Sequence, residues 1–208
     1  MSQIGQDKLI AERFKFPFES VESCAWTLTH FFKAELGKRG VDRLASELDA
    51  ATENHINNVS RWLVEGEKSA LLMAGSVGNG KTTMLNAVCR MCNKIYYSNW
   101  SVARKAWVWH NALDIVGGYN NELFSVCQHT EWLAIDDLGQ EPAEIQNYGT
   151  VVYPIRDLLL YRYENNLLTL MTTNLKPSDL RKRYGDRVAD RLNEMCQVEF
   201  YQEPSYRK

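Results

Sequence analysis

Short apolar runs alternate along the chain with longer segments in which apolar residues recur every three or four positions. The runs have the length of buried strands, and the segments between them have the spacing of helices that bury one face. Strands are therefore predicted at residues 69–74, 105–110, 132–139, 167–174 and 197–201. Strands that alternate with helices favour parallel βαβ units with right-handed crossovers. The predicted fold class is α/β, a three-layer sandwich around a five-stranded parallel sheet.

Helical spacing is found in the segments between these strands. It is clear over 82–92, and between Asn111 and Cys127 it is interrupted at Gly117 and Gly118. A further helical pattern extends over 148–165. Because proline disrupts the interior of a helix but is tolerated in its first turn, the regular part of this helix is expected to begin at Pro154.

Residues 1–50 are predicted to form a short helical N-terminal region, ahead of a main domain at residues 51–208. Helical spacing in this first part of the chain is clearest from Ala25 to Leu36, and another helix is expected from Glu47 to Leu63. The N-terminal region is too short to enclose a core of its own. It is therefore expected either to cap the main domain or to dock on a partner.

The composition is that of one main globular domain, with 208 residues of which 45% are hydrophobic and 24% charged. The chain has no apolar stretch of membrane-spanning length and no signal-peptide pattern at its start, so no membrane contact and a cytoplasmic location are expected. Its five cysteines give no disulfide framework. Cys89 and Cys92 are expected to be core thiols, because no second cysteine pair would complete a zinc site. The formal charge of −2 excludes a uniformly basic nucleic-acid binder but permits local basic patches.

The most specific motif is a phosphate-binding loop, G-x-x-x-x-G-K-S/T, placed between the first predicted strand and the helix that follows. Its glycines let backbone N–H groups and the positive end of the helix face phosphates. Lys81 would reach the β- and γ-phosphates, and Thr82 would bind Mg²⁺. The motif with these flanks predicts a site for ATP and Mg²⁺ rather than a surface turn. The binding residues expected are Gly75, Ser76, Val77, Gly78, Asn79, Gly80, Lys81, Thr82 and Thr83.

A second chemical signal lies near the end of the predicted strand 132–139. Its first four residues are apolar, and the two carboxylates Asp136 and Asp137 follow them. Buried parallel strands end in this way when their carboxyl ends open onto a site. Asp136 is the expected Mg²⁺ ligand. Asp137 would orient or deprotonate the attacking water, and Glu141 is the second candidate for this base. The alternative is that the two aspartates only cap the following turn.

Four segments together resemble a known family: 75–83, 135–141, 172–175 and 187–192. They are similar to the AAA+ ATPases of the DnaC/IstB type, and the resemblance extends from about Asn57 to Lys208. It implies an AAA+ fold with ATPase activity and without a C-terminal helical lid domain. It also implies a homo-oligomer that binds its nucleotides at the interfaces between subunits.

The resemblance also implies roles for individual residues outside the phosphate loop. Asn174 corresponds to the sensor-1 residue, which contacts the attacking water or the γ-phosphate. Arg191 corresponds to the arginine finger that reaches the nucleotide of a neighbouring subunit, with Arg187 as the alternative. Arg207 corresponds to the sensor-2 arginine, which contacts the γ-phosphate within its own subunit.

Members of this family load the replicative helicase onto single-stranded DNA during DNA replication, or help a transposase choose its target. The residues near Arg191 and Arg207 look closer to helicase loaders, so a replicative helicase and single-stranded DNA are the expected partners. An IstB-like transposition helper is the first alternative. A nucleotide-gated adaptor with little hydrolysis is another, because Asp137 stands where glutamate is commoner. A small-molecule kinase also carries the phosphate loop, but it needs no counterpart of Asn174.

Four residues near the second predicted strand are candidates for contact with single-stranded DNA: Lys105, Trp107, Trp109 and His110. Cations bind the DNA backbone, and aromatic rings stack on bases. The alternative is that both tryptophans belong to the core of the sheet.

Overall fold

A computed structural model describes residues 16–40, 47–98, 106–203 and 205–206, and the side chains of residues 96–98 are outside the description. Its centre is a five-stranded sheet of order β2-β3-β6-β1-β7 in which every pairing is parallel. The α/β class and the five-stranded parallel sheet predicted from the sequence are therefore confirmed. The strands of this sheet are β1 Ala70–Gly75, β2 Val108–Asn111, β3 Trp132–Leu138, β6 Leu168–Thr173 and β7 Cys196–Tyr201.

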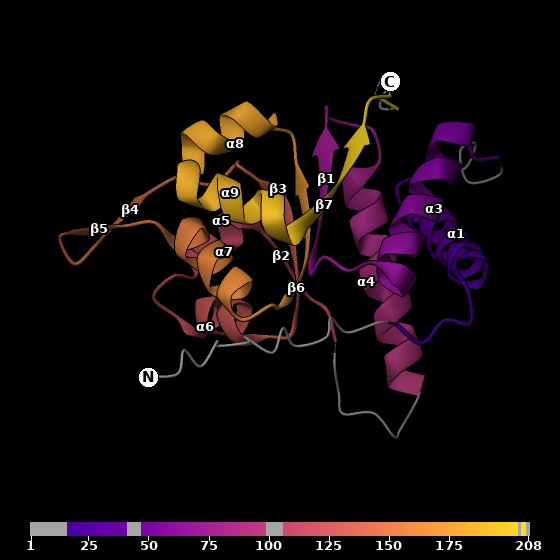
Figure 1. Cartoon of the computed structure of the whole chain (residues 1–208), viewed down its shortest axis with the longest axis horizontal. Helices are drawn as coiled ribbons and strands as arrows, with labels where there is room; N and C mark the ends of the chain where they lie inside the picture. The colour runs from indigo at the N-terminus through magenta and orange to yellow at the C-terminus, as the bar shows by residue number, and fades with distance from the viewer. Residues whose placement is uncertain (1–15, 41–46, 99–105, 204, 207–208) are drawn as a thin grey trace, which may run out of the picture.

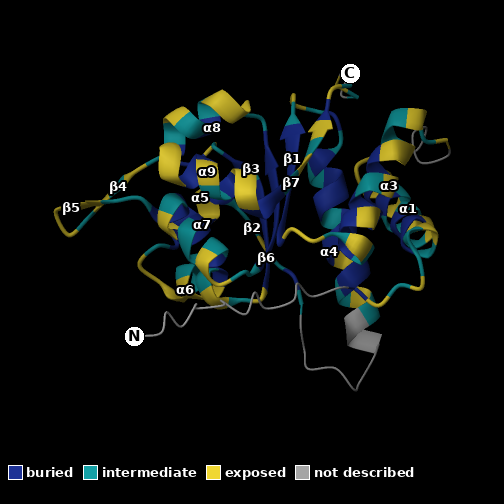
Figure 2. Cartoon of the chain, in the orientation of Figure 1, coloured by how far each residue is buried: buried dark blue, intermediate teal, exposed yellow. Residues whose placement is uncertain are grey.

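Helices cover both faces of the sheet, which gives the three layers seen in Figure 1. One layer consists of α1 Val21–Lys38, α3 Ala50–Glu65 and α4 Lys81–Ser98. The other consists of α5 Ala112–Gly117, α6 Glu122–His129, α7 Pro154–Glu164, α8 Pro177–Tyr184 and α9 Asp186–Met195. The core is correspondingly divided into two apolar clusters, one on each face, which appear as the dark interior in Figure 2.

The first helix of the described chain is part of this core. Ser20 and Ser23 form a reciprocal capping box that satisfies backbone donors at the start of α1. Leu28 and Phe32 on α1 are buried in the same cluster as Trp62 of α3. Thus α1 and α3 share one core cluster with α4, the helix that begins at Lys81 of the phosphate loop.

Two local predictions need correction. The second strand begins at Val108, and Trp107 lies before it, buried between Phe16 and Trp132. The helical pattern assigned to 148–165 begins instead with an antiparallel hairpin, β4 Ile145–Asn147 and β5 Thr150–Val152. Alternation and helical spacing are hard to distinguish over so few residues, and the turn at Tyr148 and Gly149, where φ is positive at both residues, closes the hairpin. The helix itself begins at Pro154, as predicted.

Other expectations agree with the structure. All five cysteines are buried and free. The break at Gly117 and Gly118 separates α5 from α6. Within the described part of the chain, no helix is both long and apolar enough to cross a membrane.

Candidate nucleotide-binding site

The carboxyl ends of three neighbouring strands, β3, β6 and β1, bring the predicted chemistry to one edge of the sheet. Strand β1 ends at Gly75, and α4 begins at Lys81, so the phosphate loop connects the two elements. Gly75, Gly78 and Gly80 all have positive φ. At Gly75 a Cβ atom would lie 2.1 Å from the carbonyl oxygen of Tyr201, so no larger residue fits.

The loop residues Lys81 and Asn79 hold one another in place. The Lys81 ammonium donates hydrogen bonds to the carbonyl oxygens of Gly75 and Ser76, at 2.9 and 2.6 Å, and to Asn79 Oδ1 at 3.0 Å. Asn79 in turn donates from Nδ2 to the carbonyl oxygen of Tyr201 at 2.9 Å. The buried amide of Asn79 therefore ties the phosphate loop to the end of β7 and keeps the Lys81 ammonium at the loop.

Asp136 and Thr82, the two predicted metal ligands, are in contact. Thr82 Oγ1 donates to Asp136 Oδ1 at 3.0 Å, and Thr172 Oγ1 donates to the same oxygen at 2.5 Å. Burial raises the pKa of Asp136, as does the neighbouring charge of Asp137, although the Thr172 hydrogen bond opposes the shift. A partly desolvated carboxylate beside a hydroxyl oxygen is a donor set that suits Mg²⁺, since a cation would compensate its charge.

Asp137 has an unusual backbone conformation with φ of 54°, and the pairing of β3 with β6 shifts register between Ile135 and Leu138. Its N–H donates to Thr172 Oγ1 at 2.9 Å, which supports this conformation. Asn174 Nδ2 lies 3.5 Å from Asp137 Oδ1. The bulge thus turns the Asp137 carboxylate out of the strand and toward Asn174, which follows the neighbouring strand β6.

Glu141 has a different environment from Asp137. Its side chain is buried and accepts hydrogen bonds from the N–H of Gly139 at 2.8 Å and from the Tyr184 hydroxyl at 2.5 Å. Arg183 Nε lies 3.4 Å from the same carboxylate. These partners orient Glu141 away from the cavity, so Asp137 is the better-placed candidate for the base.

A cavity of about 730 Å³ lies over the phosphate loop and includes Asp137 and Asn174 in its wall. Part of its wall is apolar and is formed by Phe32 and Leu36 of α1 together with Leu48. The remaining lining residues are Arg39, Asp49, Thr52, Val77, Gly78, Asn79, Gly80, Lys81, Thr82, Thr83, Gln140 and Tyr206. One cavity therefore combines the cationic group of Lys81 with an apolar surface.

The segment after β7 closes part of this cavity. The backbone N–H of Tyr206 donates to the carbonyl oxygen of Gly78 at 3.0 Å, and its hydroxyl donates to Asp49 Oδ2 at 2.7 Å. Asp49 also caps the start of α3 by accepting from the N–H of Thr52. The predicted sensor-2 residue Arg207 lies outside the described residues. Sequence reasoning missed Tyr206 and Asp49, because no local pattern joins two residues so distant in the chain.

Strand β7 and the segment after it are both fixed to α3 by His55. Its Nδ1 lies 2.5 Å from Glu199 Oε1 and its Nε2 lies 3.1 Å from Glu203 Oε2, while its ring stacks on Tyr201. Burial acts to lower the pKa of His55, but the hydrogen bonds and charges of the two glutamates outweigh it and raise the pKa. We call His55, Glu199 and Glu203 the tail clamp.

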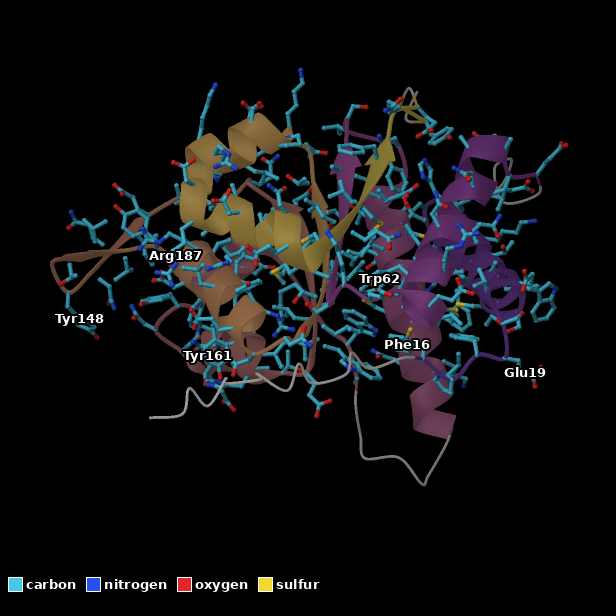
Figure 3. The ribbon with its side chains drawn as sticks, in the orientation of Figure 1. Phe16, Glu19, Trp62, Tyr148, Tyr161 and Arg187 are labelled. Atoms are coloured by element: carbon cyan, nitrogen blue, oxygen red, sulfur yellow. The ribbon has the colours of Figure 1, made fainter. Side chains whose placement is uncertain are left out.

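Arg191 and Arg187 are on α9, in the helical layer opposite α4 (Figure 3 labels Arg187). Arg191 donates to Glu194 at 2.8 Å and lies over the ring of Tyr163, and Arg187 is 3.5 Å from Glu164. Neither arginine lines the cavity. Their role across a subunit interface stays a prediction.

The candidate DNA contacts differ in accessibility. Trp107 is 5% exposed and packs in the core, so its proposed stacking on a DNA base was wrong. Trp109 is 43% exposed at β2 and remains accessible, as does the partly exposed His110. Lys105 lies outside the described residues.

The strand order, the phosphate loop between β1 and α4, and the acidic end of β3 define a P-loop NTPase fold. No protein-family model matches the sequence, and no curated protein matches it. The structure is similar to that of the DnaC helicase loader, with 19% identity, a TM-score of 0.54 and coverage of 74% of this chain and 91% of that one. DnaI is 21% identical, with a TM-score of 0.57 and coverage of 77% and 87%.

A nucleotide-bound structure is also similar. DnaA from Aquifex aeolicus with bound AMPPCP is 17% identical to this chain, with a TM-score of 0.54 and coverage of 74% of this chain and 47% of that one. These likenesses concern the fold, and they agree with the P-loop α/β fold predicted from the sequence.

Proposed function

We propose that this protein binds ATP with Mg²⁺, hydrolyses it, and uses the cycle to load a replicative helicase onto single-stranded DNA. The observation that carries the ATPase part is the meeting of three groups at one cavity, which Lys81, Thr82, Asp137 and Asn174 line. They are the phosphate loop with Lys81, the contact between Asp136 and Thr82, and the approach of Asn174 to Asp137. Similarity to the fold of a helicase loader supports the choice of partner.

The cavity suits a nucleoside triphosphate in size and polarity. Its volume of about 730 Å³ is within the usual range of small-molecule sites. Backbone N–H groups at the start of α4 and the Lys81 ammonium would bind the phosphates, and the apolar wall with Phe32 and Leu36 would receive the base. Asp136 and Thr82 would hold Mg²⁺, which supplies positive charge to the phosphates when bound.

Hydrolysis would then depend on Asp137 and Asn174. The Asp137 carboxylate accepts a hydrogen bond from the attacking water and orients it, and Asn174 donates to the water or to a γ-phosphate oxygen. Because the two side chains already lie 3.5 Å apart, little rearrangement is needed to place one water between them and the phosphate.

Lys81→Ala tests the phosphate loop. The variant should lose about 10- to 100-fold in ATP affinity, since it removes a charge-assisted contact to the β- and γ-phosphates. Lys182→Ala is the control, because Lys182 is a lysine on α8 whose side chain is 82% exposed. Titration with a fluorescent ATP analogue measures both. Equal affinity in folded Lys81→Ala and the parent protein would contradict the nucleotide site.

The helicase-loading part is tested with the purified host helicase and circular single-stranded DNA. We expect ATP-dependent deposition of the helicase on the circle, and Lys81→Ala should abolish it. Stimulation of a transposase on double-stranded DNA without such deposition would favour the IstB-like transposition helper.

A second candidate, the nucleotide-gated adaptor, is favoured by one observation. The side chain of Asp137 is one methylene shorter than glutamate and projects from a backbone with φ of 54°. ATP binding with turnover no faster than spontaneous hydrolysis, with and without DNA, would select this candidate and reject the ATPase.

A further inference from the structure

Glu141 is a buried carboxylate placed between two parts of the molecule. Its partner Gly139 belongs to the loop that follows Asp137, and its partners Tyr184 and Arg183 belong to the end of α8. Burial and the negative charge of Glu141 raise the pKa of Tyr184, so the tyrosine keeps its proton and its hydroxyl donates a hydrogen bond to the carboxylate. One side chain therefore joins the loop to the helix.

The loop between Asp137 and Glu141 has little freedom to adjust. Gly139 has a φ of 102°, and a Cβ atom there would lie 2.4 Å from Leu175 Cδ1, so the loop backbone packs directly on the residue after Asn174. Asp137 itself has positive φ, which costs a residue with a side chain roughly 1–3 kcal/mol unless its surroundings enforce it. Glu141 thus accepts a hydrogen bond from a tightly packed backbone that directly continues from Asp137.

The helix at the other end of this connection leads to the predicted arginine fingers. Tyr184 is the last residue of α8, and only Gly185 separates it from α9, which carries Arg187 and Arg191. Arg181 of α8 contacts Asp186 at 2.6 Å and Asp190 at 2.8 Å, both on α9. Helices α8 and α9 thus form one connected arm.

We propose that Glu141 is a positioning residue that couples the Asp137 loop to the α8–α9 arm, so that the arm of a subunit sets the catalytic geometry of the same subunit. The proposal rests on the proposed ATPase activity. It replaces the idea that Glu141 acts as a base, because its carboxylate is held by Tyr184 and Gly139. An arm displaced by contact with a neighbour would move the Asp137 carboxylate through Glu141.

The first test compares Tyr184→Phe with Tyr161→Phe. Tyr161 is a half-buried tyrosine of α7 and is not among the partners given above for Glu141, so its change is a matched control. Tyr184→Phe removes only the hydroxyl that holds Glu141. We expect an unchanged KM for ATP and a fall in kcat of about tenfold or more, as expected for a misplaced catalytic group. Glu141→Gln should behave in the same way, and thermal unfolding of each variant identifies loss of folding.

The second test introduces Tyr184→Phe into only one of the two kinds of subunit in a mixed assembly. Arg191→Ala subunits keep their own catalytic site, and Lys81→Ala subunits keep Arg191. If the mixture regains turnover, adding Tyr184→Phe to the Arg191→Ala subunit should abolish most of the gain. Adding it to the Lys81→Ala subunit should have no effect, because coupling acts within the subunit that hydrolyses ATP.

The outcomes separate the coupling from the ATPase itself. Normal kcat in both Tyr184→Phe and Glu141→Gln, with turnover in the parent, overturns the coupling and leaves the ATPase intact. The coupling is also overturned if turnover is lost only when Tyr184→Phe is on the Lys81→Ala subunit. The contact between Tyr184 and Glu141 would then position Arg191 instead of Asp137. A parent protein that binds ATP without turnover overturns the proposed hydrolysis, and the coupling with it.

Discussion

Asp136 and Asp137 are adjacent in the chain, yet the two carboxylates have different surroundings. Asp136 accepts hydrogen bonds from two threonine hydroxyls and is largely removed from water, whereas Asp137 faces the cavity near Asn174. A carboxylate fixed by two donors suits a metal ligand, and one that opens on a cavity suits a group that contacts water. At this scale the division of roles follows from the β3 bulge, which turns only the second aspartate outward.

Asp136→Asn should separate stability from activity. The variant should retain part of its ATP affinity but lose Mg²⁺-dependent turnover, because the charge at the metal site is gone while the phosphate loop remains. Since the pKa of Asp136 is raised in the folded protein, its ionised form destabilises the fold at neutral pH. The unfolding temperature without nucleotide should therefore rise, on the order of 2 to 4 °C.

Steady-state ATPase assays and thermal unfolding check these outcomes. Asp157→Asn on α7 provides a matched control, since Asp157 is an exposed aspartate paired with Arg156 outside the cavity. Mg²⁺-dependent turnover at the parent rate in Asp136→Asn would refute the metal assignment.

At the scale of elements, β7 and the segment that follows it are attached at several points. His55 joins α3 to Glu199 and Glu203, Asn79 bonds the carbonyl oxygen of Tyr201, and Tyr206 reaches both Gly78 and Asp49. The tail clamp therefore joins α3 to β7 and to Glu203, three residues before Tyr206 of the cavity wall. We expect its protonation state to affect how firmly Tyr206 closes that wall.

The tail clamp predicts a pH dependence of stability. The folded-state pKa of His55 is raised above its ordinary value of about 6.5, so the protonated ring contributes stability that is full below that value. This contribution is lost as the pH rises through the raised pKa, when Glu199 and Glu203 lose the cation between them. The free energy of unfolding should decline above pH 6.5 more steeply in the parent than in His55→Gln.

Urea unfolding at several pH values from 5.5 to about 9 provides the measurement. His30→Gln is the control, because His30 is an exposed histidine on α1 whose Nδ1 contacts only its own helix backbone at Trp26. Parallel pH profiles for the parent and His55→Gln would show that the clamp does not titrate in this range.

At the scale of the whole molecule, α4, the helix that follows the phosphate loop, and α9 pack on opposite faces of the sheet. Arg187 and Arg191 of α9 do not line the cavity of their own chain. An arginine that acts in catalysis from there would need a second copy. The β4–β5 hairpin extends from the same side, with Tyr148 98% exposed at its tip (Figure 3). The assembly that the arginine-finger role requires stays a prediction.

Arg191→Ala tests the assembly directly. It should bind ATP about as well as the parent, while hydrolysis falls by a large factor, roughly 10³ to 10⁵ where such arginines act in trans. Mixing it with Lys81→Ala should partly restore turnover, because one subunit supplies Arg191 and the other an intact phosphate loop. Turnover of the mixture, with light scattering to confirm mixed assembly, provides the measurement.

Two results would reject this role for Arg191. One is an assembled mixture that remains as inactive as either variant alone, in which case Arg187 is the next candidate. The other is a monomeric protein with full turnover, because a finger in trans requires a neighbour.

The sequence by itself determined the features that depend on local pattern. Apolar runs identified the five sheet strands, and a contiguous motif identified the phosphate loop, since its chemistry requires residues next to one another in the chain. The acidic end of β3 was also predictable, because buried parallel strands become polar only where they leave the sheet. The β4–β5 hairpin was missed because its strands of three residues are too short to show alternation.

Only the tertiary structure decided which side chains meet. Glu141 turned out to be buried against Tyr184, Trp107 to be packed against Phe16, and Tyr206 to contact Asp49. Each of these contacts joins residues that are far apart in sequence, and local pattern carries no information about such pairs. Burial and pairing depend on how whole elements pack, so the different surroundings of Asp137 and Glu141 come from the arrangement of β3, β6 and α8.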